Sequence, residues 1–307
     1  MSVHRMTILL LGADGQVGYE LHRAFAPLGS VMPCTRSGIL PGGTRCTRID
    51  FAEAGILAKL IAGQRPTLVL NAVAHTQVDR AEDEPALAQR INADAVAELA
   101  QACAMHGAKL VHYSTDYVFG GEGRRPWKED DATAPLGVYG RTKLAGEEAI
   151  RASGCRHMIL RTAWVYAARG QNFLRTALRL AGEREELRIV SDQIGSPTPS
   201  RWLAVATALA HARNADANGT WHVVADGECS WHQFAAAIYS EALATKVLER
   251  APRLIGIPSS EYPTKAKRPA YSRLDTTRFA GDFGLQLPDW RDGLRQVIGE
   301  LAEHKAG

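Results

Sequence analysis

Cysteine is scarce in this chain, and its five cysteines form no C-x-x-C pair. An odd number of cysteines without paired spacing argues against both a disulfide framework and a cysteine zinc site. Long apolar runs are also lacking, since none approaches the ~18 residues that a membrane span needs. No signal-peptide pattern precedes the strand-like segment MTILLLG. We therefore expect a cytoplasmic protein.

A strong charge of either sign is missing as well, because 36 basic residues nearly balance 33 acidic ones, for a net charge of +3. So small an excess does not argue for nucleic acid, and no basic stripe with interleaved aromatics appears. These absences exclude membrane and nucleic-acid partners from the interpretation. What remains is a globular chain of 307 residues, long enough for one large domain or two closely joined ones.

Apolar runs alternate with helical patterns along the first half of the chain, in the order TILLLG, QVGYELHRAFAPLG, VMPC, ILAKLIAGQ, TLVLNAV, ALAQRINADAVAELAQACAMHG and KLVHYS. Such alternation predicts an α/β fold, a Rossmann-type doubly wound parallel sheet. Residues 1–165 are predicted to form the dinucleotide-binding domain, to which some later segments return. Residues 166–307 are predicted to form mainly a smaller C-terminal substrate-binding lobe. Ligands of such sheets bind outside the carboxyl ends of the strands.

Three glycines, Gly12, Gly15 and Gly18, follow the first strand and open the first helix. Glycine permits a tight turn and close approach of the backbone to a pyrophosphate, while a helix N-terminus offers unpaired N–H groups. Because strand, loop and helix occur in the right order, the pattern predicts dinucleotide binding rather than a plain glycine turn.

The residues after the second strand bear on which dinucleotide binds. A site for NAD usually carries a carboxylate there, whereas this chain has Thr35 and Arg36. A guanidinium and a hydroxyl suit a 2′-phosphate, so we predict NADPH, with NADH left open. Asp50 and Phe51, which follow a third short run, are candidates for contact with the adenine end.

Tyr139 and Lys143 are four residues apart and share one face of a predicted helix. A neighbouring ammonium favours a phenolate, so Lys143 is expected to lower the pKa of Tyr139 toward a working range. Thr115, at the end of a predicted strand, could bond the substrate oxygen that Tyr139 protonates. In isolation, Y-x-x-x-K is more often a solvated helical pair. After a glycine loop and an STD strand end, it predicts carbonyl reduction.

The chain resembles the extended short-chain dehydrogenase/reductase superfamily in motifs that run almost end to end. They are LLGADGQVGYEL, LNAVAHTQVDRAE, NADAVAELA, YSTDYVFGG, VYGRTKLAGEE, ILRTAWVY, VSDQIGSPT, ADGECSW and KRPAYSRLD. Within that superfamily it is similar to the reductases that form dTDP-L-rhamnose from its 4-keto precursor.

The resemblance implies a role for several residues. Tyr139 would be the general acid, and Lys143 would hold the cofactor ribose. The remaining cofactor contacts would be Gly15, Gln16, Val17, Asp50, Phe51, Ala74, His75 and Thr76. The nucleotide-sugar substrate would meet Thr115, Asp116 and Trp164. On base rates, His75 and His112 are structural histidines rather than catalysts.

Other members of the superfamily provide alternatives. Nucleotide-sugar 4,6-dehydratases carry an Asp-Glu pair after the threonine, but Tyr117 follows Asp116 here. Epimerases retain NAD, which the Arg36 argument opposes. A reductase or epimerase of another nucleotide keto-sugar stays open. So does a non-catalytic regulatory subunit with a dinucleotide pocket, similar to the methionine adenosyltransferase β subunit.

The sequence departs from these relatives at two places. Where KRPAYS has Tyr271, they often have asparagine. Some carry an acidic residue soon after SPT that helps a metal ion join two subunits, whereas this chain has Arg201. Glu20 remains a candidate ligand, but a cation rarely sits beside an arginine. We predict no metal site and leave Mg²⁺ undecided, and a homodimer is expected only because dimers are common.

Overall fold

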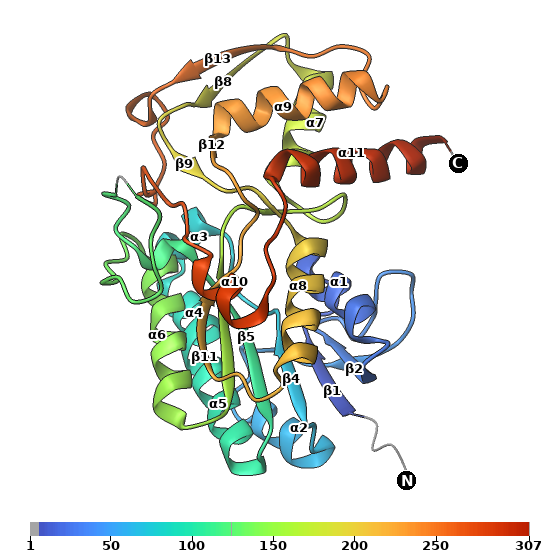
Figure 1. Cartoon of the computed structure of the whole chain (residues 1–307), viewed down its shortest axis with the longest axis vertical. Helices are drawn as coiled ribbons and strands as arrows, with labels where there is room; N and C mark the ends of the chain where they lie inside the picture. Colours follow the sequence, from blue (N-terminus) through green and yellow to red (C-terminus); the bar gives the residue numbers. More distant parts are fainter. Residues whose placement is uncertain (1–5, 124, 307) are drawn as a thin grey trace.

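A seven-stranded parallel sheet forms the centre of the computed structural model, which describes residues 6–123 and 125–306 (Figure 1). The strand order is β11-β6-β5-β4-β1-β2-β3. The strands are β1 (Met6–Leu11), β2 (Gly29–Thr35), β3 (Thr47–Arg48), β4 (Leu68–Asn71), β5 (Lys109–Thr115), β6 (His157–Thr162) and β11 (Gly219–His222). Because every strand pair in this sheet is parallel, the carboxyl ends of all seven strands lie at one edge.

Helices cover both faces of this sheet, and the alternation of β1 explains why. Ile8 and Leu10 pack on one face, whereas Leu9 and Leu11 pack on the other. The first face is covered by α1 (Gln16–Phe25), α8 (Ser200–Arg213) and α10 (Thr277–Phe283). The second is covered by α2 (Ile56–Gln64), α5 (Ala95–His106) and α6 (Val138–Ser153). The predicted α/β class with a Rossmann-type doubly wound sheet is confirmed.

A second hydrophobic core lies beyond the carboxyl ends of the sheet (Figure 1). It is built around Phe234 and Trp290 from α7 (Phe173–Glu183), α9 (Trp231–Ala244) and α11 (Trp290–Ala306). Three short strand pairs accompany these helices: β8 (Glu186–Val190) with β13 (Arg253–Ile257), β9 (Ile194–Gly195) with β12 (Cys229–Ser230), and β7 (Val165–Tyr166) with β10 (Thr198–Pro199).

Short helices connect the main elements. They are α3 (Val78–Asp83), α4 (Pro85–Gln89), the π-helical turn η1 (Arg90–Asp94), and the 3₁₀ turns η2 (Asp116–Val118) and η3 (Ser259–Glu261). Three elements of the second half of the chain lie on the central sheet, since β11 pairs with β6, α8 packs against α1, and α10 packs against β11. The domain boundary at residue 165 stays a prediction. Within the described ranges, no helix is both long and apolar enough to cross a membrane.

Candidate active site

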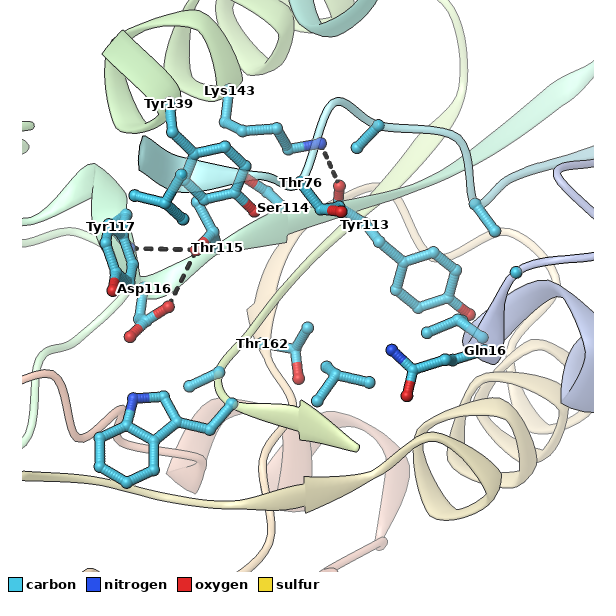
Figure 2. Close-up of a pocket in the computed structure, with 18 of the residues that line it drawn as sticks. Gln16, Thr76, Tyr113, Ser114, Thr115, Asp116, Tyr117, Tyr139, Lys143 and Thr162 are labelled. Carbon is cyan, nitrogen blue, oxygen red and sulfur yellow. Dashed lines mark hydrogen bonds between the residues drawn. The ribbon is translucent and has the colours of Figure 1, made fainter. Parts of the chain in front are cut away.

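A cavity of about 680 Å³ lies at the carboxyl ends of the central strands. Its walls come from the loop between β1 and α1, the loop after β4, the end of β5 with η2, and α6. The later half of the chain adds Trp164, Trp231 and Arg268. Figure 2 shows Tyr139 and Lys143 reaching from α6 toward the end of β5, with Gln16 across the cavity. Segments that are distant in sequence therefore line one cavity.

The glycine loop brings backbone N–H groups to the cavity. Gly12 adopts a positive φ of 80°, and its N–H donates to the carbonyl of Cys34, so the loop is fastened to β2. A Cβ on Gly18 would lie 1.9 Å from the Gly12 oxygen, so only glycine lets α1 approach this closely. No side chain caps α1 at Gly15. Its first N–H groups are thus available to a bound anion.

Tyr139 is partly buried, and its ring packs edge-on against Tyr117 with centroids 5.6 Å apart. Burial raises the pKa of Tyr139 to about 12, although a hydrogen bond with Thr115 opposes the rise. The expectation that Lys143 brings this pKa down is wrong here, because desolvation raises it and the negative charge of Asp116 raises it further. Tyr139 is therefore a neutral phenol at neutral pH.

Lys143 is 1% exposed. Its Nζ donates to the Tyr113 carbonyl at 2.6 Å and lies 3.1 Å from His112 Nε2. Burial lowers the pKa of Lys143 to about 8, against an opposing effect of Glu147. A buried lysine that titrates near neutrality is typical of functional sites.

Thr115 and Asp116 form a compact group at the end of β5 (Figure 2). The Thr115 hydroxyl donates to Asp116 Oδ1 at 2.9 Å and accepts from the Tyr117 N–H at 3.2 Å. Burial raises the pKa of Asp116 to about 6, while hydrogen bonds from Ser272 and Thr115 oppose the rise. Two of the three residues that the sequence assigns to the substrate thus lie beside Tyr139.

Trp164 lies in the cavity wall, stacked on Trp231 with ring centroids 3.5 Å apart and planes 6° apart. Its φ is +47°, a conformation that costs an L-residue about 1–3 kcal/mol. Gly195 makes room for the indole, since a Cβ there would lie 2.5 Å from the ring. The backbone strain is tolerated where it places a flat apolar surface beside the cavity.

Three residues of the site were not predicted from the sequence: Arg268, Trp231 and Asn92. Arg268 lines the cavity and pairs with Asp79 at 2.6 Å, which holds its guanidinium in place. Asn92, fully buried in η1, bonds the backbone of His75 on both sides and the Thr142 hydroxyl on α6. The motifs KRPAYSRLD, ADGECSW and NADAVAELA contain these residues, but only the fold brings them to one place.

Six predicted cofactor residues do not line the cavity: Gly12, Thr35, Arg36, Asp50, Phe51 and His75. Thr35 lies at the end of β2 with its hydroxyl bonded locally, and Arg36 is exposed. Asp50 accepts the Ala52 N–H, and Phe51 packs in the core beneath α2. The roles of these six residues stay predictions, as do those of the predicted residues in the cavity wall.

Arg201 forms ion pairs with both Glu20 and Glu300 at the junction of α1, α8 and α11. The carboxylate of Glu20, a candidate metal ligand from the sequence, is thus paired with the guanidinium of Arg201. Among the described residues, no group of three or more His, Cys, Asp or Glu side chains is arranged to hold a metal ion.

The family model of the RmlD substrate binding domain matches residues 6–303. The chain belongs to this family. Proteins named dTDP-4-dehydrorhamnose reductase from Escherichia coli K12 and Burkholderia thailandensis are 46% and 44% identical to it. Each alignment covers 96% of this chain, and 98% and 99% of the respective relative.

Solved structures of the RmlD family superimpose along nearly the whole chain. The dTDP-4-dehydrorhamnose reductase of Bacillus anthracis in complex with NADP has a TM-score of 0.87 and 33% identity, covering 96% of this chain and 99% of that one. The UDP-glucose 4-epimerase of Thermus thermophilus in complex with NAD has a TM-score of 0.81 at 19% identity, covering 96% of this chain and 99% of that one. So distant a likeness shows the fold alone.

Proposed function

We propose that this chain is an NADPH-dependent reductase that converts the 4-keto group of dTDP-4-dehydro-L-rhamnose to the alcohol of dTDP-L-rhamnose. One observation carries the proposal: the partly buried phenol of Tyr139 lines the same cavity as the uncapped N-terminus of α1. A proton donor and a dinucleotide site then line one cavity. Carbonyl reduction requires this, because a proton and a hydride must reach the same carbonyl group. The relatives named dTDP-4-dehydrorhamnose reductase support this choice of substrate.

The residues of the cavity fit a dinucleotide. Gly15, Gln16 and Val17 would hold the pyrophosphate on the free N–H groups of α1, and Ala74 and Thr76 would line its nicotinamide half. Lys143 would hold the ribose. A bound NADPH supplies the hydride to the carbonyl carbon. The NADP complex of the Bacillus anthracis relative supports this cofactor.

Preference for NADPH over NADH rests on Arg36. Its guanidinium is exposed just after β2, and no described residue forms an ion pair with it. An unpaired guanidinium suits a 2′-phosphate. Thr35, whose hydroxyl is hydrogen-bonded to Ser37 and Ile39, also fixes the local backbone beside Arg36.

Tyr139 gives its proton to the substrate oxygen as the hydride arrives at the carbonyl carbon. The raised pKa of Tyr139 suits this direction, because the residue keeps its proton until the developing alkoxide takes it. The Thr115 hydroxyl donates its single hydrogen to Asp116 at 2.9 Å, and it would turn that hydrogen toward the same substrate oxygen to orient it.

The substrate end of the cavity has an apolar wall and a cation. Trp164, stacked on Trp231, gives a flat surface against the nucleotide-sugar. Arg268 binds the diphosphate of the substrate, and Asp79 preorganises its guanidinium. Lys143 and Arg268 are the cations among the described residues that line the cavity, and they stand at its cofactor and substrate parts respectively.

The test supplies the purified protein with NADPH, or with NADH, and with the dTDP-4-keto-6-deoxy sugar formed in place by the dehydratase and the 3,5-epimerase. We expect loss of nicotinamide absorbance that requires the epimerase, and dTDP-rhamnose as product. The ratio of the two cofactors tests Arg36. Absence of oxidation with either cofactor, from protein that binds dinucleotide, would contradict the proposal. A cytoplasmic location and a homodimer remain predictions.

A further inference from the structure

Two groups surround the Lys143 nitrogen at hydrogen-bond distance, and they differ in what they can do. The Tyr113 carbonyl, 2.6 Å away, only accepts. His112 Nε2, 3.1 Å away, can either accept or donate, depending on which ring nitrogen carries the hydrogen. The tautomer of His112 therefore decides whether Lys143 meets an acceptor or a donor on that side.

Asn71 fixes this tautomer. Its Oδ1 accepts the Val73 N–H at 3.1 Å, which sets the orientation of the amide. Its Nδ2 then points at His112 Nδ1, 3.0 Å away. An amide nitrogen is a donor, so Nδ1 must accept and the hydrogen of the neutral ring lies on Nε2. Burial holds the pKa of His112 well below its usual value, so the ring is neutral.

His112 thus presents an N–H to Lys143, and this arrangement conflicts with an ammonium group. An ammonium has three donors and no acceptor, so two donors would face each other. Asn71 and His112 are fully buried and Lys143 is 1% exposed, so water cannot relieve the clash. A neutral amine resolves it, because its lone pair accepts from His112 while one N–H donates to Tyr113.

We propose that Asn71 and His112 are positioning residues that hold Lys143 in a network where its amine gives up its proton within the neutral range. The inference rests on the proposed function, in which Lys143 faces the bound dinucleotide. Desolvation acts in the same direction, since burial lowers the pKa of Lys143 to about 8 against the opposing effect of Glu147.

The titratable groups that line the cavity together with Lys143 are Tyr139 on α6, Tyr113 on β5, Asp116 and Tyr117 on η2, Asp14 in the glycine loop, and Arg268. Glu147 lies one turn further along α6. Glu147 opposes loss of the proton. Its charge is offset by Arg161 at 2.7 Å and Arg151 at 3.1 Å. Tyr113, Tyr117 and Tyr139 have raised pKa values and remain neutral.

The protonation of Lys143 affects how tightly an anionic dinucleotide binds. An ammonium attracts the phosphates and ribose oxygens more strongly than an amine does. The dissociation constant for NADPH should therefore rise with pH once Lys143 loses its proton. The pH at which this rise begins is called the break. One proton linked to binding makes that rise up to about tenfold per pH unit.

The experiment measures the dissociation constant for NADPH by nicotinamide fluorescence across the neutral and alkaline range, without any sugar. The test variants are His112→Gln and Asn71→Asp, both of which can offer Lys143 an acceptor, the second by reversing the histidine tautomer. Lys143→Met shows whether the break belongs to Lys143, because the dissociation constant of this variant should not change with pH in that range. His157→Gln is the matched control: a histidine at the opposite end of the parallel strands whose Nδ1 bonds the Cys155 carbonyl.

We expect the break to move upward by one pH unit or more in both test variants, and to stay in place in His157→Gln. A break that stays at its wild-type position in a folded His112→Gln or Asn71→Asp protein would overturn the inference. So would an equal shift in His157→Gln. If wild-type protein binds no NADPH at any pH, the proposed function fails instead, which separates the two failures.

Discussion

Tyr139 and Asp116 both belong to the hydrogen-bonded group around Thr115, and burial moves both toward their protonated forms. The pKa values of about 12 and about 6 lie on opposite sides of neutrality. The phenol keeps its proton until the reaction takes it, whereas the carboxylate is mostly ionised at neutral pH and can orient Thr115. Environment, rather than residue type, assigns these two roles.

The buried carboxylate predicts a pH-dependent cost in stability. Because the folded pKa of Asp116 exceeds its ordinary value, the folded protein binds more protons between about pH 4 and 6, and stability falls as pH rises through that window. Asp116→Asn should therefore gain stability relative to wild type between about pH 4 and pH 7, by on the order of 3 kcal/mol at most. Urea unfolding at both pH values measures this, and a difference between the proteins that is independent of pH would contradict it.

Replacing Arg268 should weaken binding of the substrate but not of the cofactor. Arg268→Gln should raise KM for the nucleotide-sugar by about tenfold to a hundredfold, because a charge-assisted contact to the diphosphate is lost. The dissociation constant for NADPH should stay unchanged. Lys265→Gln is the matched control, since Lys265 lies on the same segment and pairs with Asp83 on α3, but does not line the cavity. Equal kinetics in the two variants would remove Arg268 from the site.

For single residues, the sequence was enough to predict some roles but not others. Tyr139, Lys143 and Thr115 could be assigned because their spacing and neighbours define one helix face and one strand end. The sign of the effect on Tyr139 could not, because it depends on how deeply the phenol is buried. The Asn71–His112–Lys143 network was also out of reach, since it joins β4, β5 and α6 through side-chain orientation.

Two helices carry much of the chemistry, α1 with its glycine loop and α6, and each lies against a neighbouring backbone segment. The Gly12 and Ala13 N–H groups donate to the Cys34 carbonyl, so the loop follows the end of β2. Gly146 brings α6 close to η1, where a Cβ would lie 2.2 Å from the Asn92 oxygen. The glycine pattern made the loop predictable. The role of Gly146 was not, because a helical glycine does not reveal its neighbour.

The close approach of α1 predicts the effect of adding one methyl group. Gly18→Ala would bring a Cβ within 1.9 Å of the Gly12 oxygen, so the loop or the helix must shift. We expect a loss of about 1–3 kcal/mol in stability together with weaker NADPH binding.

Gly182→Ala provides the matched control for that change. Gly182 lies in α7 with nothing near its would-be Cβ, so alanine there should be neutral or slightly stabilising. Thermal unfolding and NADPH titration of both variants measure the contrast. A Gly18→Ala protein with wild-type stability and affinity would show that the approach is not required.

At the scale of the whole molecule, the two halves of the chain close one cavity from opposite sides. The central sheet supplies the glycine loop, Thr115, Tyr139 and Lys143, whereas Trp231 and Arg268 come from beyond the sheet. The alternating apolar pattern was enough to predict the sheet. It was not enough to place Arg268 against α3, because that contact spans 189 residues of sequence and depends on how the later segments fold back.

The most direct test of this account is a single-turnover comparison of wild type with Tyr139→Phe. Each protein, preloaded with NADPH, is mixed rapidly with the dTDP-4-keto-6-deoxy sugar while nicotinamide absorbance and dTDP-rhamnose are followed. We predict a loss of about 10²–10⁴-fold in the rate of hydride transfer with unchanged NADPH affinity, because only the proton donor is removed. A folded Tyr139→Phe protein that turns over at nearly the wild-type rate would contradict the central claim.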